Sequence, residues 1–150
     1  MAALVARCRR VIEETFIWAR QRKAFGGSLS DMPVVRLRLG ELLSDFSLIE
    51  SSYERLVYKY SIMSLAEQNA KLGGQTAILK HAVTRATGRI CEQALNIAGG
   101  RGMEEQGLGS TVNRVFRSYK IFSIGGGTED AMLGLGVRQT LGKLPKNARL

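Results

Sequence analysis

Long apolar segments and prolines are scarce in this sequence of 150 residues. No apolar run approaches the ~20 residues that a membrane-spanning helix requires, so we expect no membrane span. Only two prolines occur, Pro33 and Pro145, which favours long helices over a turn-rich β sandwich. Hydrophobic residues make up 45% of the chain, which is enough to build the core of one ordinary domain.

Cysteine and histidine are also rare, with two cysteines and one histidine in the chain. Cys8 and Cys91 form no C-x-x-C pair, so neither a zinc site nor any other metal site is predicted. Both are expected to be reduced, partly buried thiols of an intracellular protein. His81 follows Lys80 on a predicted helix and is more typical of a surface side chain than of a catalytic one. No signature of Ser–His–Asp or Cys–His catalysis is present.

Basic residues outnumber acidic ones by 22 to 13, which gives a net charge of +9 with histidine neutral. This charge indicates an anionic partner, such as a nucleic acid, an acidic membrane surface or a phosphate-bearing small molecule. The basic residues are scattered along the chain, and their longest runs are pairs such as Arg9-Arg10. A nucleic-acid-binding face usually concentrates its charge and carries a recognisable motif, so we do not expect a nucleic-acid partner.

The amino terminus allows two interpretations. Residues 1–10 (MAALVARCRR) are rich in arginine and lack acidic residues, like the start of an organelle transit peptide. However, the apolar residues of this region share one helical face that runs through the supposed cleavage site: Leu4, Cys8, Val11, Ile12, Phe16 and Ala19. The periodicity therefore favours one continuous helix from about residue 2 to residue 23.

A heptad seam is the strongest periodic signal and predicts a long second helix. Apolar residues recur at alternating steps of four and three: Val35, Leu39, Leu42, Phe46, Ile49, Tyr53, Leu56, Tyr60 and Met63. Asp31 is the expected N-cap of this helix, and Pro33 occupies its first turn. Leu43 and Val57 widen the apolar stripe, so we expect a packing partner on each side of the helix.

Glycines divide the second half of the chain. A break at Gly73-Gly74 precedes a third helix, and a glycine-rich loop over residues 101–109 precedes a short helix that Ser110 or Thr111 opens. Thr128 is the expected N-cap of a last helix, which ends at the segment Leu144-Pro145-Lys146-Asn147. The whole pattern predicts one all-α domain over residues 1–150, a four-helix up-down bundle with long antiparallel helices.

Two of the glycine-rich turns could bind an anion. The segments at residues 99–102 (GGRG) and 125–128 (GGGT) lie next to helix ends, where backbone N–H groups can hold phosphate. Glycine is also the ordinary residue at a helix stop, and neither segment fits a nucleotide-binding fingerprint. The residues alone therefore indicate a basic helical bundle with loops that favour anions.

Four short motifs follow one another in the chain: RKAFG at residues 22–26, NIAGGRG at 96–102, RVFR at 114–117 and GGTED at 126–130. In this order they resemble the C-terminal helical domain of the FAD-dependent acyl-CoA dehydrogenases. The corresponding family patterns are R-x-x-F-G, Q-x-x-G-G-x-G, Y-R-D and E-G-T-x-E. The resemblance covers nearly the whole chain, and the long second helix lies where the family has one.

The resemblance implies FAD as the cofactor, bound between this bundle and a middle β domain. Arg22 would contact the FAD pyrophosphate, a role that suits the guanidinium fork. Phe25 would pack near the cofactor. The remaining implied contacts are Asn96, Gly99 and Gly100 at the far end of FAD, and Thr128 and Asp130 at the start of the last helix.

The catalytic position departs from the family pattern. Many members carry the glutamate that removes the α-proton of the acyl thioester directly before G-T, and this position is Gly126 here. Other members carry it on the first helix, at a position that would fall a few residues before Met1. Two interpretations follow: the chain is part of a dehydrogenase whose base lies upstream, or it is a catalytically dead homologue that serves as an assembly or interaction module.

The resemblance also implies which partners the protein has. The chain would contribute FAD binding and subunit assembly to a homodimer or homotetramer that oxidises an acyl-CoA, and alone it would be inactive. An electron-transfer flavoprotein would accept the electrons, as is usual in the family. The expected location is the mitochondrial matrix or the bacterial cytoplasm.

Overall fold

The computed structural model describes residues 1–144 and has the expected all-α architecture. Its helices are α1 (Ala2–Gln21), α2 (Pro33–Ile62), α3 (Leu65–Lys71), α4 (Gly73–Ala98), α5 (Gly107–Ile124) and α6 (Glu129–Leu141). Between them lie a hairpin of β1 (Lys23–Ala24) and β2 (Gly27–Ser28) and two 3₁₀ helices, η1 (Leu29–Asp31) and η2 (Gly99–Met103). None of the helices in this part of the chain combines the length and apolar character that crossing a bilayer requires.

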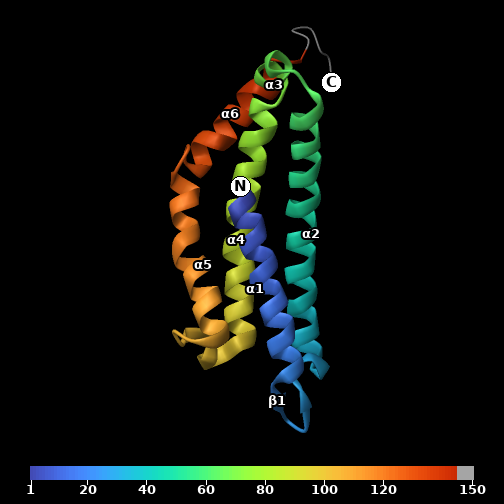
Figure 1. The fold of residues 1–150 in the computed structure, drawn as a ribbon, viewed down its shortest axis with the longest axis vertical. Coiled ribbons are helices and arrows are strands. Elements are labelled where there is room, and N and C mark those ends of the chain that lie inside the picture. Colours follow the sequence, from blue (N-terminus) through green and yellow to red (C-terminus); the bar gives the residue numbers. More distant parts are fainter. Residues whose placement is uncertain (145–150) are drawn as a thin grey trace.

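Four helices alternate in direction along the long axis of the molecule, which confirms the up-down bundle. In Figure 1, α1 descends to the hairpin, α2 rises, α4 descends beside it and α5 rises again. After a bend, α6 continues upward along the first half of α4. The last helix ends at Leu141, and Pro145, which was expected to follow its end, lies outside the described residues.

Helix α4 is the centre of the bundle because it packs against α1, α2, α5 and α6. Val83, Ile90 and Ala94 on this helix are completely inaccessible to solvent. Small residues let α6 approach closely, since a Cβ added at Gly136 would lie only 2.4 Å from Cδ1 of Ile78. This glycine of α6 therefore serves close packing against α4.

The predicted heptad seam faces the core over most of α2. Six of its nine members are buried: Val35, Leu39, Leu42, Phe46, Ile49 and Leu56. The seam opens towards the end of the helix, where Tyr60 is 38% exposed. Leu43 and Val57, which were expected to meet a second partner, are each 46% exposed. Among residues 1–144, nothing covers the second side of the apolar stripe.

Two predictions at the start of the bundle were wrong. The first helix ends at Gln21, because Lys23 and Ala24 pair with Ser28 and Gly27 in an antiparallel hairpin. Asp31 does not cap α2, since its carboxylate instead accepts hydrogen bonds from the backbone N–H (2.9 Å) and hydroxyl (2.7 Å) of Ser28. These contacts close η1, and Met32 occupies the N-cap position of α2.

Two further helices, α3 and α5, also differ from the expectation. The sequence pattern missed α3, which begins with a capping box in which Ser64 and Glu67 bond reciprocally. Helix α5 begins at Gly107, earlier than Ser110 or Thr111, and extends to Ile124. Glycine has a low helix propensity, so packing of this turn against η2, rather than local preference, accounts for the early start.

Candidate functional site

The β1–β2 hairpin presents two predicted cofactor-binding residues at one end of the bundle (Figure 1). Arg22 is the C-cap of α1, with its N–H donating to the Trp18 carbonyl at 2.9 Å and its own carbonyl accepting from Leu29 N–H at 2.9 Å. Phe25 and Gly26 form the two-residue loop with φ values of 52° and 83°, as in a type I′ turn. The Phe25 side chain is 93% exposed. A positive φ is unfavourable for a residue with a Cβ, so this loop combines a strained backbone conformation with an exposed aromatic ring.

The guanidinium of Arg22 is exposed and has no carboxylate within ion-pair distance among residues 1–144. Other arginines of the bundle do have such partners, and Arg89 forms a bidentate pair with Asp45 at 2.8 and 2.7 Å. Arg22 is therefore available for an external anion.

The second group of predicted residues lies where α4 ends. Asn96 is exposed on the last turn, and Gly99 and Gly100 are exposed directly after it. Gly99 has φ 61° and ψ −144°, a conformation that only glycine adopts without strain. A Cβ added at either glycine would meet nothing within 4 Å, so the backbone here is open to a ligand. This turn lies at the same end of the bundle as the hairpin (Figure 1).

The third group lies where α5 meets α6, away from that end (Figure 1). Thr128 caps α6 as predicted, since its Oγ1 accepts a hydrogen bond from Ala131 N–H at 3.3 Å. Asp130 is exposed in the first turn of α6, next to the positive end of the helix dipole. The 18 residues of α5 span about 27 Å, so in one chain Thr128 and Asp130 are well separated from the Gly99 turn.

A cavity of about 440 Å³ adjoins this third group, and the sequence did not suggest it. Its wall joins the start of α1 to α2, α4 and the α5–α6 turn: Met1, Leu4, Tyr60, Gly73, Thr76, Ala77, Lys80, Thr84, Phe122, Gly125, Gly126, Met132 and Leu135. Most of these side chains are apolar. The polar groups include Lys80, whose Nζ donates to the Gly127 carbonyl, and a hydrogen bond of 2.9 Å between the hydroxyls of Tyr60 and Thr76.

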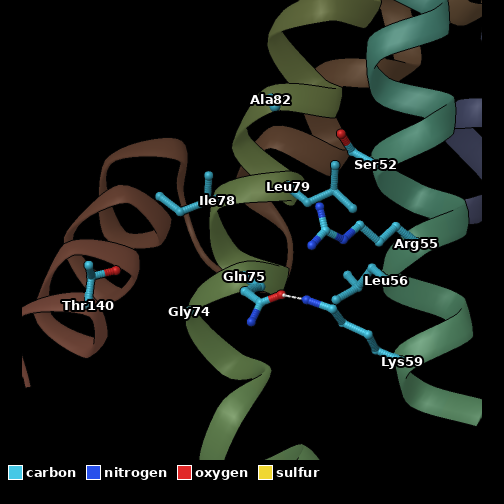
Figure 2. Close-up of a pocket in the computed structure, with 10 residues that line it drawn as sticks. All are labelled: Ser52, Arg55, Leu56, Lys59, Gly74, Gln75, Ile78, Leu79, Ala82 and Thr140. Carbon is cyan, nitrogen blue, oxygen red and sulfur yellow. Dashed lines mark hydrogen bonds between the residues drawn. The ribbon is translucent and has the colours of Figure 1, made fainter. Parts of the chain in front are cut away.

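A groove of about 540 Å³ between α2 and α4 is shown in Figure 2. Arg55 and Lys59 reach it from α2, and Lys59 Nζ donates to Oε1 of Gln75 at 2.6 Å. Its floor is apolar, with Leu56 and Leu79. None of the predicted site residues lines this groove, and the described residues that line it include no carboxylate, imidazole or thiol for acid–base chemistry.

The two cysteines are unsuited to catalysis. Cys8 and Cys91 are free and completely buried. Burial raises the pKa of Cys8 to about 11 and that of Cys91 to about 12. Because the thiolate is the reactive form, neither group is a nucleophile at neutral pH.

The sequence matches known proteins over nearly its whole length. A family profile described as "Acyl-CoA dehydrogenase, C-terminal domain" matches residues 1–141. The chain belongs to the acyl-CoA dehydrogenase family. The acyl-CoA dehydrogenase apdG of Emericella nidulans is 33% identical over 140 residues, which cover 93% of this chain and 32% of that protein. The chain thus spans about a third of the length of this relative.

Two solved structures share the fold of this chain. An acyl-CoA dehydrogenase from Geobacillus kaustophilus superposes with a TM-score of 0.80 at 22% identity, covering 92% of this chain and 34% of that one. The FAD complex of PigA superposes with a TM-score of 0.79 at 19% identity, covering 93% and 34%. The acyl-CoA dehydrogenase bundle is therefore the fold of this chain.

Proposed function

We propose that this chain is the C-terminal domain of a flavin-dependent acyl-CoA dehydrogenase, in which it binds the adenosine diphosphate part of FAD and joins subunits. The main support is the end of α1 and the hairpin after it, where the ring of Phe25 is exposed and the guanidinium of Arg22 has no carboxylate partner among residues 1–144. A planar fork of N–H donors at this position suits a pyrophosphate. PigA, whose bundle is similar, forms a complex with FAD.

The residues of this chain fit the cofactor. Arg22 would pair with the diphosphate, while Phe25 would cover an apolar part of the ligand. The open backbone at Gly99 and Gly100 leaves room for a close approach, with the exposed Asn96 amide beside it. When bound, FAD would supply the hydride acceptor for oxidation of the acyl thioester. The bundle would orient the cofactor and contribute to its affinity.

Residue 126 cannot take part in proton removal, because a glycine has no group to act as a base. The proposal therefore places the base on another part of the protein. The second candidate, a dead homologue that acts as an assembly module, rests on the same glycine. A glutamate about four residues before Met1 in the complete protein would favour the dehydrogenase, and its absence would favour the module.

Replacing Arg22 by alanine tests the proposed cofactor site. Hydrogen bonds to charged groups contribute about 1.5–3 kcal/mol, so we expect FAD to bind about 10- to 150-fold more weakly to the complete protein. Flavin fluorescence during titration of the apoprotein measures this. Arg20→Ala, which removes an exposed arginine two residues earlier on α1, is the matched control. Equal FAD affinities of Arg22→Ala and the wild type would contradict the proposal.

The 150-residue chain by itself should not form a stable flavoprotein. It supplies only one side of the proposed FAD site, because the middle domain would hold the flavin ring. We expect FAD added to the chain to remain largely free after gel filtration. A stoichiometric, yellow and reducible complex would show that these helices hold the cofactor alone and would refute this part of the proposal.

We expect the protein to self-associate through the exposed apolar stripe on α2. Burying Leu43 and Val57 against another subunit removes apolar surface from water, so sedimentation velocity at tens of micromolar should show dimers or tetramers. Leu43→Lys with Val57→Lys should shift the protein towards monomer. Leu48→Lys, which lies about 140° round the helix from Leu43, should have a smaller effect. A strictly monomeric wild-type protein would be inconsistent with this assignment.

A further inference from the structure

Two side chains of α4 hold the turn between α5 and α6. Lys80 Nζ donates a hydrogen bond to the carbonyl of Gly127. One helical turn later, Thr84 Oγ1 donates to Oε1 of Glu129 at 2.8 Å. The two contacts flank Thr128, which is the N-cap of α6. Because residues four apart lie on one face of a helix, Lys80 and Thr84 act on the turn from the same side.

Two glycines give this turn more backbone freedom than other residues would have, although Gly125 N–H donates to the Ile121 carbonyl at 2.8 Å and Thr128 caps α6. Gly126 and Gly127 have φ values of 71° and 110°, in a region that glycine enters as readily as its mirror image. A Cβ added at Gly126 would touch nothing within 4 Å, so packing does not hold this residue, whereas one at Gly127 would lie 2.2 Å from Cε of Met132. A segment with such freedom needs contacts from elsewhere to keep one conformation. The side chains of α4 supply these contacts.

The surroundings of Lys80 indicate that its ammonium group serves to hold the Gly127 carbonyl. Its side chain is half-buried at the wall of the 440 Å³ cavity, and no carboxylate lies within ion-pair distance among residues 1–144. The bond to Gly127 is the one hydrogen bond that its ammonium makes within that range. A half-buried cation without a counter-ion is unfavourable unless its donors are used, and here one of them is used to fix a backbone carbonyl.

Glu129 connects the second contact to a charged group. Its Oε2 lies 3.9 Å from Nη1 of Arg85, while Oε1 accepts from the buried Thr84 hydroxyl. Glu129 therefore faces α4, whereas Asp130, its neighbour in the chain, is exposed. The contact of Glu129 with α4 thus orients the first turn of α6 so that Asp130 lies on its exposed side.

We infer that Lys80 and Thr84 are positioning residues, which hold the Gly125–Thr128 turn so that Thr128 and Asp130 are presented outward in a fixed geometry. The functional part of this inference rests on the proposed function, in which these two residues lie near FAD. The structural part, a turn held by α4, does not depend on any cofactor.

Hydrogen exchange followed by mass spectrometry tests the structural part on the complete protein without added FAD. Lys80→Met keeps the apolar stem and removes the donor, so exchange in peptides covering residues 125–131 should become at least tenfold faster. Peptides from the centre of α4 should be unchanged. Lys80→Arg keeps donors and should restore slow exchange. Lys23→Met, which removes an exposed lysine on the distant β1–β2 hairpin, is the matched control and should leave the turn unaffected.

Thr84→Val provides a second variant, because it keeps the shape of the side chain and removes only the hydroxyl. It should release Glu129 and accelerate exchange about fivefold around Ala131, whose N–H bonds to Thr128. Unchanged exchange at the turn in both variants would overturn the inference. Equal acceleration throughout the protein would also overturn it, since that would show loss of global stability rather than release of the turn.

The affinity for FAD separates this inference from the proposed function. If both hold, Lys80→Met should weaken FAD binding to the complete protein about fivefold or more, and Lys80→Arg should restore it. Faster exchange of the turn with unchanged FAD affinity would support the positioning role and refute the cofactor contacts of Thr128 and Asp130. Unchanged exchange with weaker FAD binding would refute the positioning role and leave the cofactor site standing.

Discussion

Replacement of Ile90 by alanine is expected to lower the free energy of unfolding by about 2–5 kcal/mol, as is usual for deleting a buried aliphatic side chain. Ile90 is completely buried on α4, the helix that packs against α1, α2, α5 and α6. The loss combines the missing apolar transfer energy with the cost of a cavity that the rigid neighbours cannot fill. Since native domains have only about 5–15 kcal/mol of stability, this variant should lie close to unfolding.

Urea denaturation followed by circular dichroism measures the effect as a lower midpoint at an unchanged slope. Leu48→Ala is the matched control, because it removes the same number of side-chain atoms from a residue that is 67% exposed. Its effect should stay within about 0.5 kcal/mol. Similar losses in the two variants would mean that α4 is not the centre of the core.

Replacement of Gly109 by alanine is expected to destabilise the protein by about 3 kcal/mol, at the upper end of the range for overpacking. A Cβ at this position would lie 2.2 Å from the carbonyl oxygen of Glu104 and 2.8 Å from that of Arg101. Both obstacles are backbone atoms, so no side-chain rotation relieves the clash. The start of α5 must move away from η2, and the turn that carries Gly99 and Gly100 should loosen with it.

Gly134→Ala distinguishes this clash from an ordinary glycine effect. Gly134 lies inside α6, and a Cβ there would meet nothing within 4 Å. The same substitution should therefore stabilise the protein by about 0.4–1 kcal/mol, because alanine restricts the unfolded chain and favours helix. Thermal unfolding should give shifts of opposite sign for the two variants. A loss of similar size in both would remove the evidence for close packing at Gly109.

Helix positions could be predicted largely from the sequence because they depend on local periodicity. The seam from Val35 to Leu56 marks the buried side of α2, and Thr128 caps α6 as expected. The predicted helix ends were wrong where contacts with residues outside the helix, rather than its own periodicity, determine where it begins. Asp31 bonds back to Ser28 instead of capping α2, and α5 starts at Gly107 because packing against η2 offsets the poor helix propensity of glycine.

For the candidate site, the sequence by itself determined the family and the residue types available to an anion, above all Arg22 and the glycines at 99 and 100. Only the tertiary structure decided where these residues lie: the hairpin and the turn after α4 share one end of the bundle, while the junction of α5 and α6, where Thr128 caps α6, lies away from that end. The contact between Lys80 and Gly127 joins positions 47 residues apart. Such pairs depend on how helices pack against one another, and the periodicity of a single helix contains no information about its neighbours' register.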